Sequence, residues 1–257
     1  MCLVAFAWKA HPRWRLVLAG NRDEFHARPA APLARWDDEP FLIGGRDLEA
    51  GGTWLAVGEN GRAGVVTNVR DPKAARDGRS RGGLLVDFLR DPANAQAHAS
   101  ALTERAATYR PFNLALFDHL GAVVVTNHPT TRWERLAPGV HALSNGAPGA
   151  SWPKTRHLRA ALNAWLANEA APVEDLFTPL GDETIWPDAE LPDTGVGLEI
   201  ERRLAPAFIR GGDYGTRACT VLATAPAGDG VIVERRFGPR GAFEGESREE
   251  FAGRNAG

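Results

Sequence analysis

The chain has 257 residues, of which 44% are hydrophobic and 24% are charged, as in an ordinary globular protein. Its formal net charge of −2 gives no electrostatic basis for binding nucleic acid. Two cysteines are too few for a disulfide framework, and the seven histidines show no metal-binding spacing. We therefore expect no metal site and a reducing, cytoplasmic setting. No apolar run is long enough for a signal peptide or a membrane anchor.

Strand patterns come in hairpin pairs at both ends of the sequence, and helical patterns lie between them. The spacing predicts helices from Ser80 onward, over residues 92–108 and over 154–170. Strands are predicted over residues 2–8, 15–20, 53–57, 63–69, 112–117, 122–126, 140–144, 216–224 and 231–237.

This order differs from the alternating strand–helix pattern of a parallel sheet, and it favours an α+β fold with antiparallel sheets covered by helices. No repeat or linker divides the chain, so residues 1–240 are expected to form a single domain. Residues 241–257 are rich in glycine and charge, and we expect them to be a frayed tail.

Residues 78–82 match G-x-S-x-G, the pattern of the nucleophile elbow in α/β-hydrolases. That elbow requires a buried strand immediately before it, whereas residues 71–77 are charged and contain a proline. Ser80 is better explained as the N-cap of the helix that follows.

Cys2 opens the first apolar run. Removal of Met1 would leave its thiol, with an ordinary pKa of about 8.5, beside a free α-amine of pKa about 8. One residue would then supply both a nucleophile and a general base. The alternative is that Cys2 is a small apolar residue at the start of a buried strand.

A dense polar cluster, Asn21-Arg22-Asp23-Glu24, follows the second strand directly. The cluster is either a solvated turn or a continuation of the strand, in which case some of its side chains point inward and need partners. In the second case, an arginine beside two carboxylates could lower the pKa of a nearby thiol and hold an α-ammonium group.

Asn68 and Asn145 both end apolar strands. Asparagine is common there because it suits turns, but its amide can also donate to a developing oxyanion. Arg217 lies at the mouth of a later strand and, taken alone, is most simply a surface residue. Cys219 alternates with Val221 and is expected in the core.

A series of short motifs runs in order from Met1 to about Phe237. It comprises residues 1–3 (MCL), 20–25 (GNRDEF), 45–47 (GRD), 51–54 (GGTW), 66–68 (VTN), 80–82 (SRG), 143–145 (LSN), 152–154 (WPK), 191–195 (LPDTG) and 214–217 (YGTR). In this series the chain resembles the NRDE family, the transport and Golgi organization protein 2 group.

The resemblance implies an αββα sandwich of two stacked antiparallel sheets with helices outside, as in N-terminal nucleophile hydrolases. More distantly, the chain is similar to choloylglycine hydrolases and penicillin V acylases. Those acylases carry Arg-Asn-x-Asp where this chain has residues 21–24, so either Asp23 or Glu24 meets the Cys2 amine. Substrate-contacting positions are expected at Asn21, Glu24 and Trp54. The implied catalytic positions are Cys2, Arg22, Asp23, Asn68, Asn145 and Arg217.

The resemblance, together with these residues, implies two alternative functions. The first is a hydrolase that cleaves an amide or thioester of a small acyl substrate, with Cys2 as nucleophile and no required cofactor. Asn145 with Asn68 would hold the oxyanion, while Arg22 and Arg217 would keep the thiolate ionised or bind an anionic group. The alternative is a non-catalytic protein that binds and traffics haem or an acyl-CoA or other lipid, although the sequence has no Cys-Pro or C-x-x-C-H haem motif. The oligomeric state is not predicted.

Overall fold

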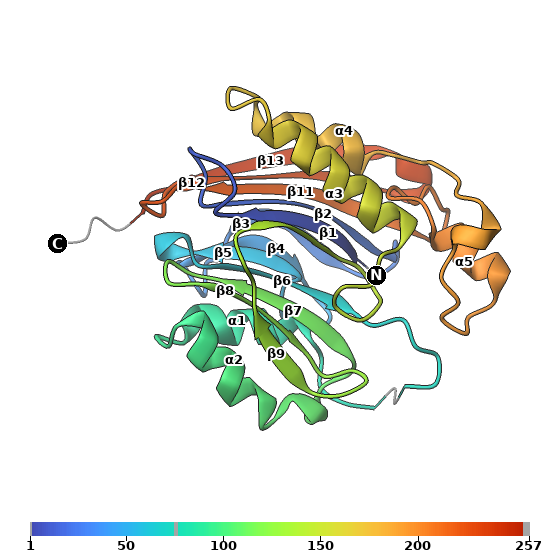
Figure 1. Ribbon diagram of the computed structural model, residues 1–257, viewed down its shortest axis with the longest axis horizontal. Helices are drawn as coiled ribbons and strands as arrows, with labels where there is room; N and C mark the ends of the chain where they lie inside the picture. The colour runs from blue at the N-terminus through green and yellow to red at the C-terminus, as the bar shows by residue number, and fades with distance from the viewer. Residues whose placement is uncertain (1, 75–76, 254–257) are drawn as a thin grey trace.

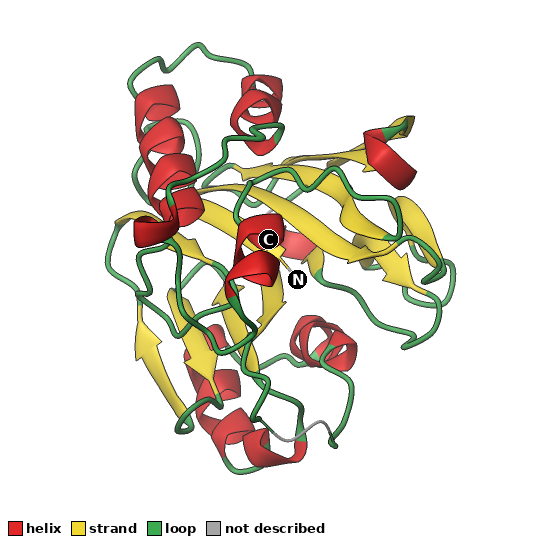
Figure 2. Ribbon diagram, turned by 90° about the vertical axis from the view of Figure 1, so that its right-hand side faces the viewer, coloured by secondary structure: helices red, strands yellow, loops and turns green. Residues whose placement is uncertain are grey.

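The computed structural model describes residues 2–74 and 77–253. Two antiparallel sheets lie face to face, and helices cover the outer side of each sheet (Figure 1). The view turned by 90° shows the two helical groups separated by the strands (Figure 2). The predicted α+β sandwich of αββα type is confirmed.

The first sheet combines the beginning, middle and end of the described chain. Its strand order is β10-β1-β2-β11-β12-β13, and all neighbours are antiparallel. The strands are β1 (Cys2–Trp8), β2 (Leu16–Phe25), β10 (Gly139–Leu143), β11 (Tyr214–Thr224), β12 (Gly230–Phe237) and β13 (Phe243–Phe251).

The second sheet is a meander whose strands follow one another in sequence order from β3 to β9. Its outer face is covered by two helices, and the outer face of the first sheet by two others. The strands are β3 (Ala30–Arg35), β4 (Leu42–Asp47), β5 (Leu55–Gly58), β6 (Ala63–Asn68), β7 (Phe112–Phe117), β8 (Ala122–Thr126) and β9 (Arg132–Arg135).

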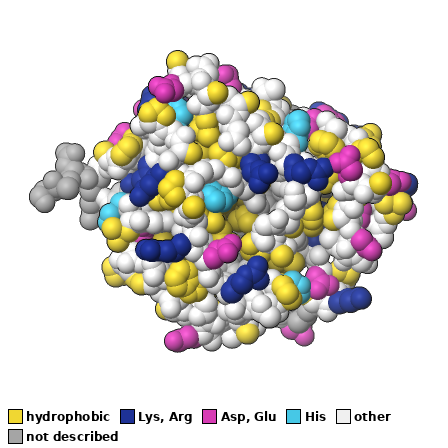
Figure 3. All heavy atoms as spheres, in the orientation of Figure 1, with side chains coloured by type: hydrophobic (Ala, Val, Ile, Leu, Met, Phe, Trp, Pro, Cys, Tyr) yellow, Lys and Arg dark blue, Asp and Glu magenta, His cyan; other side chains and the backbone are white. Residues whose placement is uncertain are grey.

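The helices pack through the apolar stripes that the sequence predicts. Leu84, Leu85 and Phe88 of α1 are fully buried on the second sheet. No helix within the described residues is long and apolar enough to cross a membrane. On the surface, basic and acidic side chains are interspersed (Figure 3). The helices are α1 (Gly82–Arg90) and α2 (Ala95–Thr103) on the second sheet, α3 (Pro153–Leu166) and α4 (Phe177–Leu180) on the first, and α5 (Leu198–Leu204).

Strand β1 is buried on both of its faces, which explains its unbroken apolar sequence. Successive side chains of a strand point to opposite faces, so alternate residues enter different cores. Complete burial of a side chain such as Phe6 contributes about 1.5–3 kcal/mol. The core between the two sheets receives Cys2, Val4, Phe6 and Trp8, and the core beneath α3 and α4 receives Leu3, Ala5 and Ala7.

The prediction of a frayed tail from residue 241 is wrong for Phe243–Phe251, which form β13 and pair with β12 along the sheet edge. The residues of β13 are mostly charged, so the strand lacks the alternation of apolar and polar residues that predicts a strand from sequence. The strand is held by main-chain pairing and by Phe251, which is buried in the core between the sheets.

A proline ordinarily interrupts a strand, yet Pro32 lies inside β3. Strand β3 is at the edge of its sheet, and its register shifts between Ala31 and Ala34. A proline is tolerated at such a position because no neighbouring strand needs its missing N–H.

Helix α1 begins one residue later than expected. Its N-cap is Arg81, and Ser80 Oγ accepts a 3.4 Å hydrogen bond from the Gly82 N–H. The predicted helix over residues 92–108 is shorter, since α2 ends at Thr103 and a separate 3-10 turn follows. The helix predicted over 154–170 ends at Leu166.

Two glycines allow the loop after β4 to touch the start of α1. A Cβ on Gly52 would lie 2.2 Å from the carbonyl carbon of Gly82, so no side chain fits there. The Thr53 N–H donates to the Gly82 carbonyl at 3.2 Å. This contact fixes Arg81 and Thr53 beside each other.

Replacement of Gly52 by alanine should lower the free energy of unfolding by about 1–3 kcal/mol, because the backbone of α1 must move to accept the methyl group. Gly83→Ala is the matched control, since a Cβ there meets no atom within 4 Å. Chemical denaturation of both variants would measure the difference. Equal stabilities would show that the contact is not tight.

Candidate active site

A cavity of about 660 Å³ lies between the two sheets, near the start of β1. Both sheets and the start of α1 contribute to its lining. Seven of the nine predicted site residues line it, whereas Asn21 and Asn145 do not. The seven are Cys2, Arg22, Asp23, Glu24, Trp54, Asn68 and Arg217.

Cys2 is the first residue of β1 and pairs with Arg22 of β2 in the sheet register. Its backbone carbonyl accepts a 3.1 Å hydrogen bond from Ser144 Oγ, and its side chain is 7% exposed. Burial raises the pKa of the thiol, and the guanidinium of Arg22 opposes that shift. The thiol is therefore fixed in place but needs a base to become a thiolate at neutral pH.

Asn68 and Asn145 are in contact, but only Asn68 lines the cavity. The Nδ2 group of fully buried Asn145 donates to both the carbonyl oxygen and Oδ1 of Asn68, each at 3.0 Å. The prediction that both amides face the oxyanion is therefore wrong for Asn145, whose two N–H groups are already used. With its side-chain oxygen engaged, Asn68 has its amide N–H groups to offer as donors.

Asp23 is buried toward the helical layer, where it accepts a 2.7 Å hydrogen bond from Thr216 Oγ1. Burial raises the pKa of this carboxyl, and the nearby ammonium of Lys154 opposes the rise. The structure therefore places a carboxylate close to Cys2 on the side away from Arg22.

Lys154, in the first turn of α3, is a residue that sequence reasoning missed. It is 3% exposed, and its Nζ donates to the Leu204 carbonyl at 2.8 Å. Burial lowers its pKa to about 8, although Asp23 favours the charged form. Its presence in a Trp-Pro-Lys motif was the only sequence signal. A buried ion pair, between Arg70 and Glu201, lies close to Lys154.

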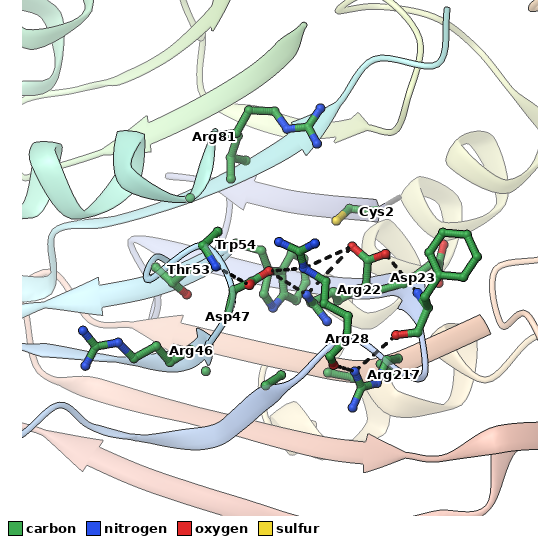
Figure 4. A pocket seen from close by; sticks show the side chains of 18 of the residues that line it. Cys2, Arg22, Asp23, Arg28, Arg46, Asp47, Thr53, Trp54, Arg81 and Arg217 are labelled. Carbon is green, nitrogen blue, oxygen red and sulfur yellow. Dashed lines mark hydrogen bonds and ion pairs between the residues drawn. The ribbon is translucent and has the colours of Figure 1, made fainter. Parts of the chain in front are cut away.

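Arg22 belongs to a charge cluster that bridges the two sheets. Its Nη2 lies 3.1 Å from Asp47 of β4 and 3.9 Å from Glu24 (Figure 4). Arg28 Nε contacts the same Asp47 oxygen at 2.7 Å. Burial acts to raise the pKa of Asp47, but hydrogen bonds from Arg28 and the Ala50 N–H prevail and lower it. Sequence reasoning assigned no role to Arg28 or Asp47, although Asp47 lies in the Gly-Arg-Asp motif.

Arg217 enters the cavity because β11 bulges at this point. Thr216 pairs with Asp23 and Ala218 with Arg22, which leaves Arg217 as the extra residue. Its Nη1 donates to the carbonyls of Phe25 and Arg28. Arg217 therefore holds the turn between β2 and β3 rather than the thiol.

Asn21 is wrongly predicted as a substrate contact. It continues the helix-facing side of β2 and is fully buried. Its Nδ2 donates to the carbonyls of Leu180 and Ala207 at 2.7 and 2.8 Å, tying β2 to the helical layer. Glu24, by contrast, does line the cavity, as does Trp54.

No group of three or more His, Cys, Asp or Glu side chains across residues 2–74 and 77–253 is arranged to hold a metal ion. Two cavity residues, Cys2 and Tyr214, are of types that ligate haem iron in other proteins. The geometry is otherwise that of a buried thiol with an amide donor and a carboxylate nearby.

Comparison with known proteins gives the family. The family model described as Transport and Golgi organisation 2 matches residues 1–239. The chain belongs to this family. The Mus musculus Transport and Golgi organization 2 homolog is 31% identical, over 91% of this chain and 92% of that protein. The Drosophila melanogaster family member, Transport and Golgi organization protein 2, is 28% identical, over 77% of this chain and 80% of its own length. The predicted family resemblance is confirmed.

Solved structures of two enzymes share the fold of this family member. One is a Caenorhabditis elegans ortholog of N-acylethanolamine-hydrolyzing acid amidase, with a TM-score of 0.53 and 11% identity, covering 88% of this chain and 93% of that chain. The other is a mutant of the conjugated bile acid hydrolase from Clostridium perfringens, with a TM-score of 0.56 and 9% identity. That likeness covers 97% of this chain and 92% of that chain. At these identities the likeness concerns the fold alone.

The buried Lys154 predicts a measurable pH dependence of stability. Its pKa is about 8 in the folded chain and 10.5 ordinarily, so between these values only the unfolded chain binds the proton. Stability that depends on Lys154 therefore rises with pH across this window. The free energy of unfolding of the wild type, relative to Lys154→Met, should increase by about 2 kcal/mol between pH 7 and pH 10.

Urea denaturation at several pH values would test this expectation. Lys73→Met serves as the control because Lys73 is exposed, and its difference from the wild type should not change with pH. A flat difference for Lys154→Met would show that the ammonium stays charged in the folded chain.

Proposed function

We propose that this protein is an N-terminal nucleophile hydrolase that cleaves an amide or a thioester of a small acyl substrate through Cys2. The observation that carries the proposal is the position of Cys2 at the start of a fully packed strand, with its thiol in a cavity. Asn68 and Asp23 line the same cavity. The fold shared with an amidase and with a conjugated bile acid hydrolase supports the same reaction class.

The reaction requires removal of Met1, which frees the α-amine of Cys2. The amine takes the thiol proton, and the thiolate sulfur bonds to the substrate carbonyl carbon. The carbonyl π electrons move to oxygen, where the Asn68 amide N–H stabilises the negative charge. Collapse of this intermediate breaks the carbon–nitrogen or carbon–sulfur bond, and the α-ammonium returns its proton to the leaving group. Water then hydrolyses the enzyme thioester and releases a carboxylic acid.

The neighbouring residues have separate parts in this scheme. Asp23, buried beside Thr216, would orient the α-amine, whereas Glu24 is engaged by Arg22 and Arg28 in the charge cluster. This division supports Asp23 over Glu24 as the partner of the amine. Arg22 favours the thiolate by its charge. Asn145 positions Asn68, and Arg217 positions the turn after β2.

Cys2→Ala should abolish turnover, with a loss of about 10³-fold or more, because no other group can form the acyl intermediate. The matched control is Cys219→Ala, which removes the other cysteine from the core beneath the helices. The measurement combines intact mass, to establish loss of Met1, with turnover of a panel of N-acyl amides and acyl thioesters. Full activity of Cys2→Ala, or of a chain that retains Met1, would reject the mechanism.

The volume of the cavity favours a second candidate, a non-catalytic protein that binds haem or an acyl-CoA. At about 660 Å³ the cavity is in the range of sites that hold complete drug-sized ligands, more than a thiol and a short acyl chain require. In that case Cys2→Ala should bind acyl-CoA as tightly as the wild type in a calorimetric titration, and the wild type should turn over no amide or thioester. Cys2-dependent turnover would reject this candidate.

A further inference from the structure

The charges around the cavity are unevenly compensated. Seven arginines and five carboxyl groups line it. Arg22 and Arg28 share Asp47, and Glu24 lies 3.9 Å from each of them. On the outer rim, Arg46 pairs with Asp38 at 2.7 Å. Asp47 and Glu24 are therefore both engaged with arginines on this side of the cavity.

Arg81 lies on the other side of Cys2 from this charge cluster (Figure 4). It is half-buried, and its Nη1 donates to the Pro111 carbonyl at 3.2 Å. Among the residues that the structure describes, no carboxylate lies within 4.0 Å of Arg81. Glu24 acts on it only at longer range, and a Cys2 thiolate would favour its charged form.

Arg110 adds a second positive charge at the rim. It is exposed, lines the same cavity, and within the described part of the chain has no carboxylate within ion-pair distance. The positive charge of Arg110 disfavours the charged form of Arg81. The hydrogen bond to the Pro111 carbonyl uses one of the five N–H donors of the Arg81 guanidinium. It therefore does not explain why a positively charged side chain lies beside the thiol.

We propose that Arg81, assisted by Arg110, binds a carboxylate of the substrate next to the Cys2 thiol. This inference rests on the proposed function, since it assumes that the cavity holds the substrate of a hydrolase. It narrows the substrate class to amides or thioesters that carry a carboxylate close to the scissile bond. A guanidinium matches a carboxylate through two parallel hydrogen bonds. Because only Arg81 is enclosed, the site suits a singly charged group better than a dianion.

The test compares two alkylating reagents of similar size, iodoacetate and neutral iodoacetamide, at Cys2. Both react with the same thiolate, so any effect of a mutation on the thiol pKa cancels in the ratio of their rates. Peptide mass spectrometry separates labelling of Cys2 from that of Cys219. In Arg81→Gln the iodoacetate-to-iodoacetamide ratio should fall at least about fivefold. Arg81→Lys should give an intermediate ratio, since it retains the charge but loses the two parallel hydrogen bonds.

Arg105→Gln is the matched control, because it removes a positive charge at an exposed ion pair with Asp87 outside the cavity. Its ratio should equal that of the wild type. An unchanged ratio in Arg81→Gln, or an equal fall in Arg105→Gln, would overturn the proposal. If Arg81→Gln does not fold, Arg110→Gln is the second variant. Its iodoacetate-to-iodoacetamide ratio at Cys2 should also fall below that of the wild type, by a smaller factor.

Alkylation needs neither turnover nor removal of Met1, so the two proposals fail separately. A chain that hydrolyses nothing but loses its preference for iodoacetate in Arg81→Gln retains the carboxylate site. A chain with Cys2-dependent turnover and an unchanged ratio retains the hydrolase mechanism and loses the carboxylate site.

Discussion

The double-sided burial of β1 is the constraint on which the rest of this structure depends. Alternate residues of the strand enter the core between the sheets and the core beneath the helices, so neither its register nor its facing can change without exposing an entire row of apolar side chains. Cys2 inherits this rigidity as the first residue of the strand. The proposed nucleophile therefore has little conformational freedom left to lose on binding the proposed substrate.

Charged groups sit on both faces of the sheet around this fixed point. Between the sheets, Asp47 joins Arg22 and Arg28, so one carboxylate connects the first sheet with the second. Beneath the first sheet, Asp23 and Lys154 share the helical layer with the Arg70–Glu201 pair. Buried charges of this kind are costly and add little net stability. Their concentration around Cys2 therefore indicates a functional arrangement more than a structural one.

Alternation and helical spacing predicted most of the strands and helices, because they report directly on burial. The stacked layers and most of the site residues were expected from the family resemblance instead. They failed where the facing of a strand had to be known. Asn21 and Arg22 are neighbours in sequence, yet one enters the helical layer and the other the cavity, and composition does not distinguish them. The edge strand β13 was missed for another reason, since it is held by main-chain pairing and carries charged side chains. Lys154 was overlooked because lysine is rarely buried and its partners come from distant segments.

The strand order of the first sheet also determines when its strands can pair during translation. Strand β1 lies between β2 and β10, and β2 lies between β1 and β11, so the sheet cannot close around Cys2 until residues 139–143 and then 214–224 have left the ribosome. The nascent chain therefore carries its first residues with one strand edge open during much of translation. In the proposed mechanism, an aminopeptidase has this interval in which to trim Met1, before β10 pairs with β1 and β11 pairs with β2.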